Sequence, residues 1–295
     1  MRAAPGIRFS TRIRETVSWK LVVSCVILAV FVVMAVFASM LAPFDPEAQQ
    51  ILQRKVPPIW HQWLFGSEKA TWTHPLGTDA LGRDYASRLM HGARVPLLIG
   101  IFALTVSGLI GVTLGVIAGY FRGWIDTLIS TVIAARLGLP IMIVSLTAVA
   151  LYGASLVTIS LVLGLLLWDR FAVAVRAATI QLREMEYVDA ARAAGASDTN
   201  ILLNEILPNL APVVAVIAAL EVGQAILLES VLSFLGLGVQ PPDFSWGLMI
   251  AEAKVDIFFD PWLAALPGTC LFIIVLGTNL LSEWLEIYSM KLGSK

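Results

Sequence analysis

The sequence predicts an all-α membrane protein with six membrane-spanning helices, and three observations support this fold class. First, 58% of the 295 residues are hydrophobic and only 14% are charged, whereas soluble domains are about a quarter charged. Second, six apolar segments are long enough to cross a bilayer, which takes roughly 20 residues of helix. Third, the formal net charge is −1, so the composition does not point instead to a protein that binds nucleic acid through an excess of positive charge.

The first apolar segment follows a basic N-terminus and could be a secretory signal. Its apolar run is long and no A-x-A site follows it, so we expect a retained membrane anchor. The six spans are predicted over residues 21–42, 96–120, 126–151, 156–175, 207–234 and 262–284.

An even number of spans places both chain ends on one side of the membrane, and positive charge selects the side. With the N-terminus inside, twelve Lys and Arg residues lie on the inner side and seven on the outer side, so the cytoplasmic assignment is favoured. The expected organisation is a cytoplasmic segment over 1–20, a first helix over 21–42, an extracytoplasmic insertion over 43–94, a five-helix core over 95–285 with a cytoplasmic loop over 184–208, and a cytoplasmic tail over 286–295.

Small residues and prolines indicate that the spans form a packed bundle. Gly111, Gly115 and Gly119 recur every fourth residue, so they lie on one helix face and let a second helix approach closely. Pro140 and Pro208 lie within or at the start of spans, and each is expected to bend or break its helix. Carbonyl groups freed by such a break are tolerated only inside protein or beside a water-filled cavity.

The loop over residues 184–208 carries the pattern E-x3-A-A-x3-G. Four residues spaced i, i+4, i+5 and i+9 lie largely on one side of a helix and carry little bulk. They are Glu186, Ala190, Ala191 and Gly195. Gly195 is expected to end this helix, and Ser197 or Asp198 to cap the next one. The spacing alone indicates an interfacial helix-turn-helix, which is either an ordinary amphipathic segment or a docking element for another protein.

This loop, followed by Ile206-Leu207-Pro208, resembles the coupling loop in membrane subunits of ATP-binding-cassette importers. Further motifs resemble the C-type permease subunits of the importers for dipeptides, oligopeptides and nickel. They are residues 74–84 (HPLGTDALGRD), 119–120 (GY), 232–242 (LSFLGLGVQPP) and 245–247 (SWG). Because the motifs extend over nearly the whole chain, the chain is identified as a member of that subfamily.

The resemblance implies a type I importer permease fold in the bacterial cytoplasmic membrane, with both termini in the cytoplasm. It implies a bilayer environment, a second permease subunit of the B type, two ATP-binding subunits and an extracytoplasmic solute-binding protein, and no nucleic acid. The chain has no G-x-x-x-x-G-K-[ST] motif, so ATP and magnesium would be bound by the partners and this chain would be neither an enzyme nor a metal or cofactor protein. The residues expected to couple to the ATP-binding subunits are Glu186, Ala190, Ala191, Gly195, Leu207 and Pro208.

Charged residues inside spans are costly and usually have a purpose. The candidates to line a substrate path are Arg136, Glu221 and Glu229. Glu221 and Glu229 are eight residues apart and share a helix face; either could bind the amino terminus of a peptide or a cation, or could pair with a basic residue of another helix such as Arg136. Asp169 and Arg170 are expected near the inner interface, where long side chains reach water.

Two turn-rich segments on the expected outer side are also singled out. In the motif over 74–84, Asp79, Arg83 and Asp84 are expected to form solvated ion pairs within a structured turn. The second segment could close an outer gate, contact the delivery protein, or be a simple loop. Its candidate residues are Gly236, Gly238, Pro241, Pro242 and Trp246.

Several positions depart from the subfamily pattern by losing positive or gaining negative charge near the expected ATPase face. They are Val173, Asn204, Glu205, Ser282-Glu283 and Glu286-Ile287. We therefore expect the ATP-binding partner to carry a compensating basic surface.

The function implied is that of a permease coupling ATP hydrolysis by its partners to alternating access, with peptides as substrate and nickel chelates, glutathione or another small solute as alternatives. An intramembrane enzyme is disfavoured because the spans contain no histidine and no G-x-S-x-G motif. A free-standing channel or secondary transporter is disfavoured because no internal repeat is evident.

Overall fold

The computed structural model describes the backbone of residues 8–293 and the side chains of residues 19–290. The first seven and last two residues, with Arg2 and Lys295 of the charge count, lie outside the described residues. The elements are α1 (Arg8–Val36), α2 (Ala38–Leu41), η1 (Ile51–Gln53), α3 (Trp60–Phe65), α4 (Tyr85–Gly92), α5 (Arg94–Phe121), α6 (Gly123–Leu137), α7 (Ile141–Tyr152), α8 (Leu156–Leu166), α9 (Trp168–Arg183), α10 (Glu186–Ala193), α11 (Asp198–Asn200), η2 (Ile201–Ile206), α12 (Leu207–Phe234), α13 (Trp246–Glu252), η3 (Ala253–Asp256) and α14 (Trp262–Gly293).

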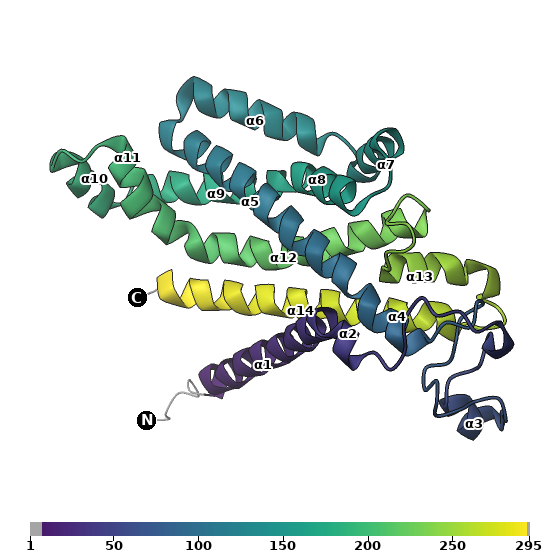
Figure 1. The fold of residues 1–295 in the computed structure, drawn as a ribbon. Coiled ribbons are helices and arrows are strands. Elements are labelled where there is room, and N and C mark those ends of the chain that lie inside the picture. Colours follow the sequence, from purple (N-terminus) through teal and green to yellow (C-terminus); the bar gives the residue numbers. More distant parts are fainter. Residues whose placement is uncertain (1–7, 294–295) are drawn as a thin grey trace, which may run out of the picture.

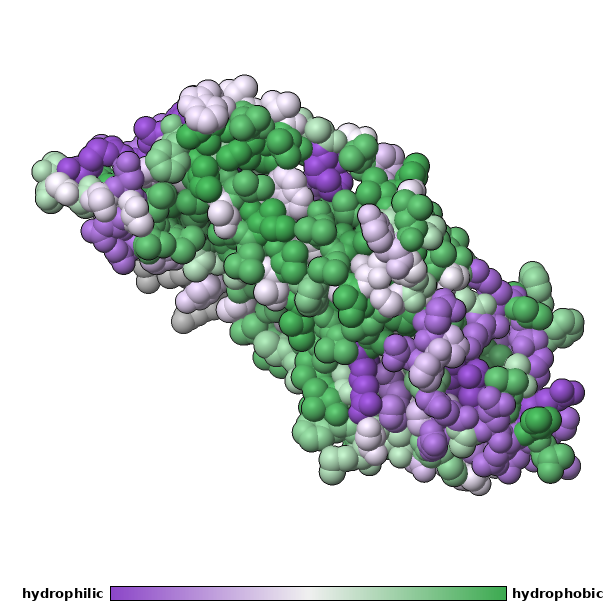
Figure 2. All heavy atoms as spheres, turned by 45° about the horizontal axis from the view of Figure 1, so that its top comes forward, coloured by the Kyte–Doolittle hydropathy of each residue, from purple (hydrophilic) through white to green (hydrophobic). Residues whose placement is uncertain are grey.

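Among the described residues, five helical segments are long and apolar enough to cross a membrane, and a bent pair of shorter helices, α6 and α7, raises the number to six. Figure 1 shows α10, α11, the start of α1 and the end of α14 at one end of the bundle, here called the loop end. Elements α3, α4 and α13 lie at the opposite end, here called the insertion end. Figure 2 shows polar side chains at both ends and an apolar belt between them. The predicted all-α, polytopic fold class is confirmed.

Pro140 breaks the third predicted span. Helix α6 ends at Leu137, α7 begins at Ile141, and the two helices are bent by 80° at this break. Proline lacks an N–H group and disfavours a helical conformation in the residue before it. The predicted span over 126–151 is therefore one bent pair rather than one straight helix, as the proline led us to expect.

Pro208 acts differently, and the expectation of a helix break there is wrong. Residues Asp198–Phe234 form one continuous helical span, in which Pro208 lies in the first turn of α12. The preceding turn, Ile201–Ile206, is a π-helix. A proline in the first turn costs little, and a wider turn can re-satisfy the backbone groups that a proline frees.

The glycine stripe of α5 packs directly against the backbone of α9. A Cβ atom added at Gly111 would lie 2.4 Å from the Trp168 carbonyl oxygen, and one added at Gly115 would lie 2.8 Å from the Ala172 carbonyl oxygen. A Cβ at Gly119 would meet the next turn of α9 equally closely. The stripe predicted from the sequence is thus a close helix–helix interface. In lipid, where the hydrophobic effect does not drive helix association, small residues stabilise such an interface by allowing close van der Waals packing.

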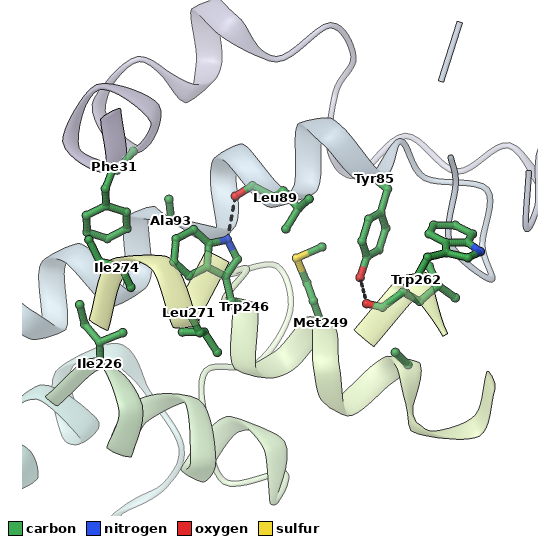
Figure 3. Close-up of a cluster of buried hydrophobic side chains, with 13 residues drawn as sticks. Phe31, Tyr85, Leu89, Ala93, Ile226, Trp246, Met249, Trp262, Leu271 and Ile274 are labelled. Atoms are coloured by element: carbon green, nitrogen blue, oxygen red, sulfur yellow. Dashed lines mark hydrogen bonds between the residues drawn. The ribbon is translucent and has the colours of Figure 1, made fainter. Parts of the chain in front are cut away.

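A buried apolar cluster joins α1, α4, α12, α13 and α14 at the insertion end (Figure 3). Within it, Trp246 Nε1 donates to the Leu89 carbonyl oxygen at 2.9 Å, and the Tyr85 hydroxyl donates to the Leu263 carbonyl oxygen. Indole and phenol groups that are buried usually find such partners. The cluster fixes the insertion to the bundle, so that both move together.

The motif over 74–84 forms a buried polar network rather than the solvated ion pairs we expected. Asp79 accepts from Arg83 at 2.6 Å and from Arg88 at 2.7 Å, and the Asp84 carboxylate lies 2.8 Å from the His74 ring. Asp79 and Asp84 are only 5% and 2% exposed, because the insertion folds over them. Buried carboxylates need such partners, and here Arg88, which the sequence did not single out, supplies one.

Candidate functional site

Helix α10 is an exposed helix at the loop end that is anchored along one side. Val188 is fully buried and Ala191 is half-buried, whereas Glu186 and Ala190 are exposed. The four-residue series expected on one face is therefore divided, since Ala191 packs on the bundle while the others face outward. Ala190 and Gly195 add little bulk to the outward side, which also carries the exposed side chains of Tyr187 and Asp189.

The end of α10 is a fully formed Schellman turn. Gly195 N–H donates to the Arg192 carbonyl at 3.0 Å, and Ala196 N–H donates to the Ala191 carbonyl at 3.1 Å. Gly195 has φ +85°, and a Cβ added there would find no atom within 4 Å. Ser197 then caps α11 by accepting from a backbone N–H. The predicted helix stop and cap are confirmed, and the turn is fixed locally rather than by packing.

The loop packs on three membrane-spanning segments through one buried cluster. This cluster contains residues from α5, α9, α10, η2 and α12, so a force on α10 acts on all of these elements. Its buried members are Val116, Tyr120, Val175, Val188, Ile201, Ile206 and Leu210.

Polar contacts add a second attachment that the sequence did not reveal. The Tyr120 hydroxyl donates to Asp198 Oδ1 at 2.6 Å, which ties the end of α5 to the start of α11. Arg183 Nη1 donates to the Tyr120 carbonyl at 2.5 Å, and its guanidinium lies 5.7 Å from the Tyr120 ring centre. The sequence motif Gly119-Tyr120 marked this residue, but no local pattern indicates a partner 78 positions away.

Leu207 and Pro208 lie at the start of α12, at the loop end, and both are exposed. Of the charge-altering departures, Glu283 forms an ion pair with Lys20 of α1, and Ser282 donates to the Val216 carbonyl of α12 at 3.0 Å. These two residues therefore contribute to contacts within the bundle. Asn204 is exposed and Glu205 half-buried, which leaves them accessible on the loop surface.

The loop that follows α12 at the insertion end is packed near its two ends, whereas residues 240–243 are exposed. Gly236 has φ +83° and open space around it, and a Cβ at Gly238 would lie 1.7 Å from Ser233 Oγ. Trp246 is 1% exposed, and the Pro241–Pro242 peptide bond between the glycines and this tryptophan is cis. The segment is thus fixed against α12 at both of its ends.

Glu229 is enclosed where this loop meets α12. Its carboxylate accepts from Ser233 Oγ at 2.6 Å and from Ser230 Oγ at 3.3 Å, and it is 0% exposed. Ser245 Oγ extends the network by donating to Ser233 Oγ at 3.2 Å. No basic side chain contacts Glu229 among residues 19–290, so the suggested pairing of Glu229 with Arg136 is wrong.

Glu221 lies two turns earlier and pairs with Arg170 instead of Arg136. Arg170 Nη1 is 3.2 Å from Glu221 Oε1. Asp169 is 6% exposed, so it does not reach water at the inner interface as expected; it lies at the start of α9, in the middle of a 28-residue span. Arg136 donates to the backbone carbonyls of Leu139 and Leu166.

Arg136, Asp169 and Arg170 line a cavity of about 300 Å³ where the α6–α7 break and the α8–α9 junction meet α12. Its lining includes Arg136, Pro140, Leu167, Arg170 and Gln224. Charge and freed carbonyl groups inside a membrane bundle require protein or water around them. A small polar solute is the kind of ligand that such a cavity can accept.

Comparison with known proteins defines the family. Residues 111–287 match the model of the binding-protein-dependent transport system inner membrane component. The chain belongs to that family. Residues 21–58 also match the N-terminal transmembrane domain of oligopeptide transport permease C. The permease is therefore a C-type subunit of an ATP-binding-cassette transporter, a multi-pass protein of the inner membrane that has no catalytic activity of its own.

Curated relatives cover most of the permease. It is 36% identical over 266 residues to the dipeptide transport system permease protein DppC of Alkalihalophilus pseudofirmus, covering 90% of this chain and 83% of the relative. It is 34% identical over 255 residues to the glutathione transport system permease protein GsiD of Pectobacterium atrosepticum, covering 86% and 81%. Membership of a binding-protein-dependent system implies ATP-hydrolysing and solute-binding partners.

The fold is shared with a solved structure of distant sequence. A chain of the inward-facing MetNI methionine ABC transporter superposes with a TM-score of 0.54 at 16% identity, covering 70% of this chain and 94% of that chain. This similarity supports the permease fold.

Proposed function

We propose that the permease is one of two membrane subunits of an importer that carries peptides, glutathione among them, across the bacterial cytoplasmic membrane. The second membrane subunit would be a B-type permease, two ATP-binding subunits would dock at the loop end, and a solute-binding protein would dock at the insertion end. The observation that carries the proposal is the attachment of an exposed helix, α10, to three spans through one buried cluster.

The coupling step follows from that attachment. ATP-driven closure of the partners would displace α10, with Glu186, Ala190, Ala191, Gly195, Leu207 and Pro208 at or beside the contact. Val188 and the Tyr120–Asp198 hydrogen bond would pass the displacement to α5, α9 and α12. Such closure changes the equilibrium between inward-facing and outward-facing states only through contacts that differ between them.

The orientation proposed places the loop end in the cytoplasm, together with both termini. In support, the start of α1 and the end of α14 lie at the same end as α10 (Figure 1), and the basic residues are concentrated there. Gly236, Gly238, Pro241, Pro242 and Trp246 then lie on the outer side, where the packed loop would serve as a gate. Arg136 and Glu221 would line the path, while Glu229 would hold the gate to α12.

Substitution at Gly195 tests the coupling role. A Cβ there meets no atom of this chain within 4 Å, so the bulk of Gly195→Trp would fall on the docked partner, while the φ of +85° adds some strain to the turn in any non-glycine variant. Gly195→Asn is the matched control, since asparagine tolerates a positive φ. We expect the Trp variant to insert normally but to lose most uptake in proteoliposomes, and the Asn variant to keep it. Wild-type uptake by Gly195→Trp would contradict the assignment.

A further inference from the structure

We propose that Arg136 forms a subsite for the carboxylate of the transported solute, so that the permease itself, and not only its binding protein, selects for a free carboxyl group. This inference rests on the proposed function and names the chemical group that the path recognises. It starts from the unusual position of Arg136, at the end of α6 beside the α6–α7 break.

The positive charge of Arg136 has no carboxylate partner among the described side chains. Its Nη2 donates to the Leu166 carbonyl, its Nη1 donates to the Leu139 carbonyl at 3.4 Å, and its Nε is buried without a partner. A contact of 3.4 Å is at the long limit for a hydrogen bond, so Nη1 is available to a stronger acceptor. An arginine inside a span without a counter-charge is costly, and ligand binding is a common reason for keeping one.

The nearby acidic groups do not pair with Arg136. Glu221 is 1% exposed and forms its ion pair with Arg170, while its second oxygen, Oε2, is buried without a hydrogen-bond partner. Asp169 is 6% exposed in the first turn of α9, where the helix dipole stabilises a negative charge, and it lines the same cavity as Arg136. The four charges sum to zero, but no carboxylate among the described side chains lies within ion-pair distance of the Arg136 guanidinium.

The cavity beside Arg136 has the size and chemistry for the carboxyl end of a small peptide. Its volume is about 300 Å³, at the lower end of the roughly 300–1,000 Å³ found for small-molecule sites. Apolar side chains of Leu137, Leu139 and Ile141 line it together with two arginines and one carboxylate, that of Asp169, so the lining carries an excess of one positive charge. A positively charged side chain binds a carboxylate through charge-assisted hydrogen bonds, which are stronger than those between neutral groups.

Arg136 could instead act only as a tether, binding the carbonyl groups that the two helix breaks expose. Substitutions at Arg136 distinguish the tether from the carboxylate subsite. Arg136→Gln keeps a donor for a backbone carbonyl but removes the charge, whereas Arg136→Lys keeps the charge. Arg94→Gln is the matched control, because Arg94 also donates to a backbone carbonyl, that of Ala35 at 3.0 Å, and lies outside this cavity.

The test uses the complete importer, with its binding protein, in proteoliposomes. The probes are a dipeptide, glutathione and the same dipeptide with an amidated C-terminus. We expect Arg136→Gln to lower the uptake ratio of free-acid to amidated dipeptide about tenfold, as loss of a charged hydrogen bond predicts. Arg136→Lys should keep most of this uptake ratio, and the Arg94→Gln control should keep all of it. ATPase stimulation by the loaded binding protein should persist in every variant.

Three outcomes would overturn the proposal. An unchanged ratio in Arg136→Gln would show a tether only, and an equal loss in Arg136→Lys would show that the guanidinium shape serves the helix breaks. Loss of the second permease from the Arg136→Gln complex would show an intersubunit ion pair. If the wild-type importer transports neither the dipeptide nor glutathione, the proposed function fails as well, and this result is distinct from the other three.

Discussion

The contact between α5 and α9 allows a sharp test of the packing, because two glycines on the same helix differ in surroundings. A Cβ at Gly115 would lie 2.8 Å from the Ala172 carbonyl oxygen and 2.9 Å from the Val175 Cβ. Neither atom is the end of a flexible side chain, so α9 would have to move. At Gly108 the nearest atom is the tip of the Phe171 ring, at 3.9 Å, which is an ordinary contact.

Replacing each glycine with alanine separates overpacking from backbone effects. Both variants gain the same helix preference, about 0.5–1 kcal/mol, and only Gly115→Ala incurs overpacking, about 1–3 kcal/mol. The two variants should therefore differ in free energy of unfolding by about 1–3 kcal/mol. The measurement is unfolding of the purified permease in detergent titrated with SDS, followed by circular dichroism. Equal stability of Gly115→Ala and Gly108→Ala would refute the close approach of α5 and α9.

Three further predictions concern coupling, docking and the insertion. Tyr120→Phe removes the hydrogen bond to Asp198, worth about 1 kcal/mol for this partly exposed pair, and should lower the amount of solute moved per ATP hydrolysed. The control Tyr152→Phe, at an 81% exposed residue, should leave this ratio unchanged. Equal ratios in the two variants would count against the attachment. An ATP-binding subunit from another system should be stimulated less than the cognate one, because Asn204 and Glu205 remain accessible; equal ATPase stimulation would remove the argument for a compensating basic surface. Trp246→Phe leaves the Leu89 carbonyl without its donor and should lower the free energy of unfolding by about 1–3 kcal/mol. The midpoint of the same SDS titration should fall, and an unchanged midpoint would contradict this prediction.

Features governed by local chemistry were predictable from the sequence. The Schellman turn at Gly195 needs only a residue that accepts φ +85° after a short helix. The break at Pro140 follows from a missing N–H group, and the glycine stripe follows from a four-residue period. The turn and the break are decided by residues within a few positions in the chain, and the period places the three glycines on one face of α5, although only the packing brings α9 onto that face.

Features governed by distant partners were not predictable. Pro208 has the same chemistry as Pro140, yet the π-helical turn before it lets the helix continue. The sequence predicts solvated ion pairs for Asp79 and Asp84, whereas in the structure the insertion folds over both residues and buries them. The pairing of Glu221 could be with any basic residue on a neighbouring helix, and only the packing of α9 against α12 selects Arg170.

By itself, the sequence determined that this chain crosses a membrane several times, where its close helix contacts lie, and which loop carries a small-residue helix, because apolar length, residue size and backbone preference are properties of neighbouring residues. Tertiary structure alone decided how that loop is attached and where each buried charge is neutralised. The Tyr120–Asp198 bond and the Arg170–Glu221 pair join residues 78 and 51 positions apart, and the energy of such contacts depends on distance in space, which no local pattern specifies.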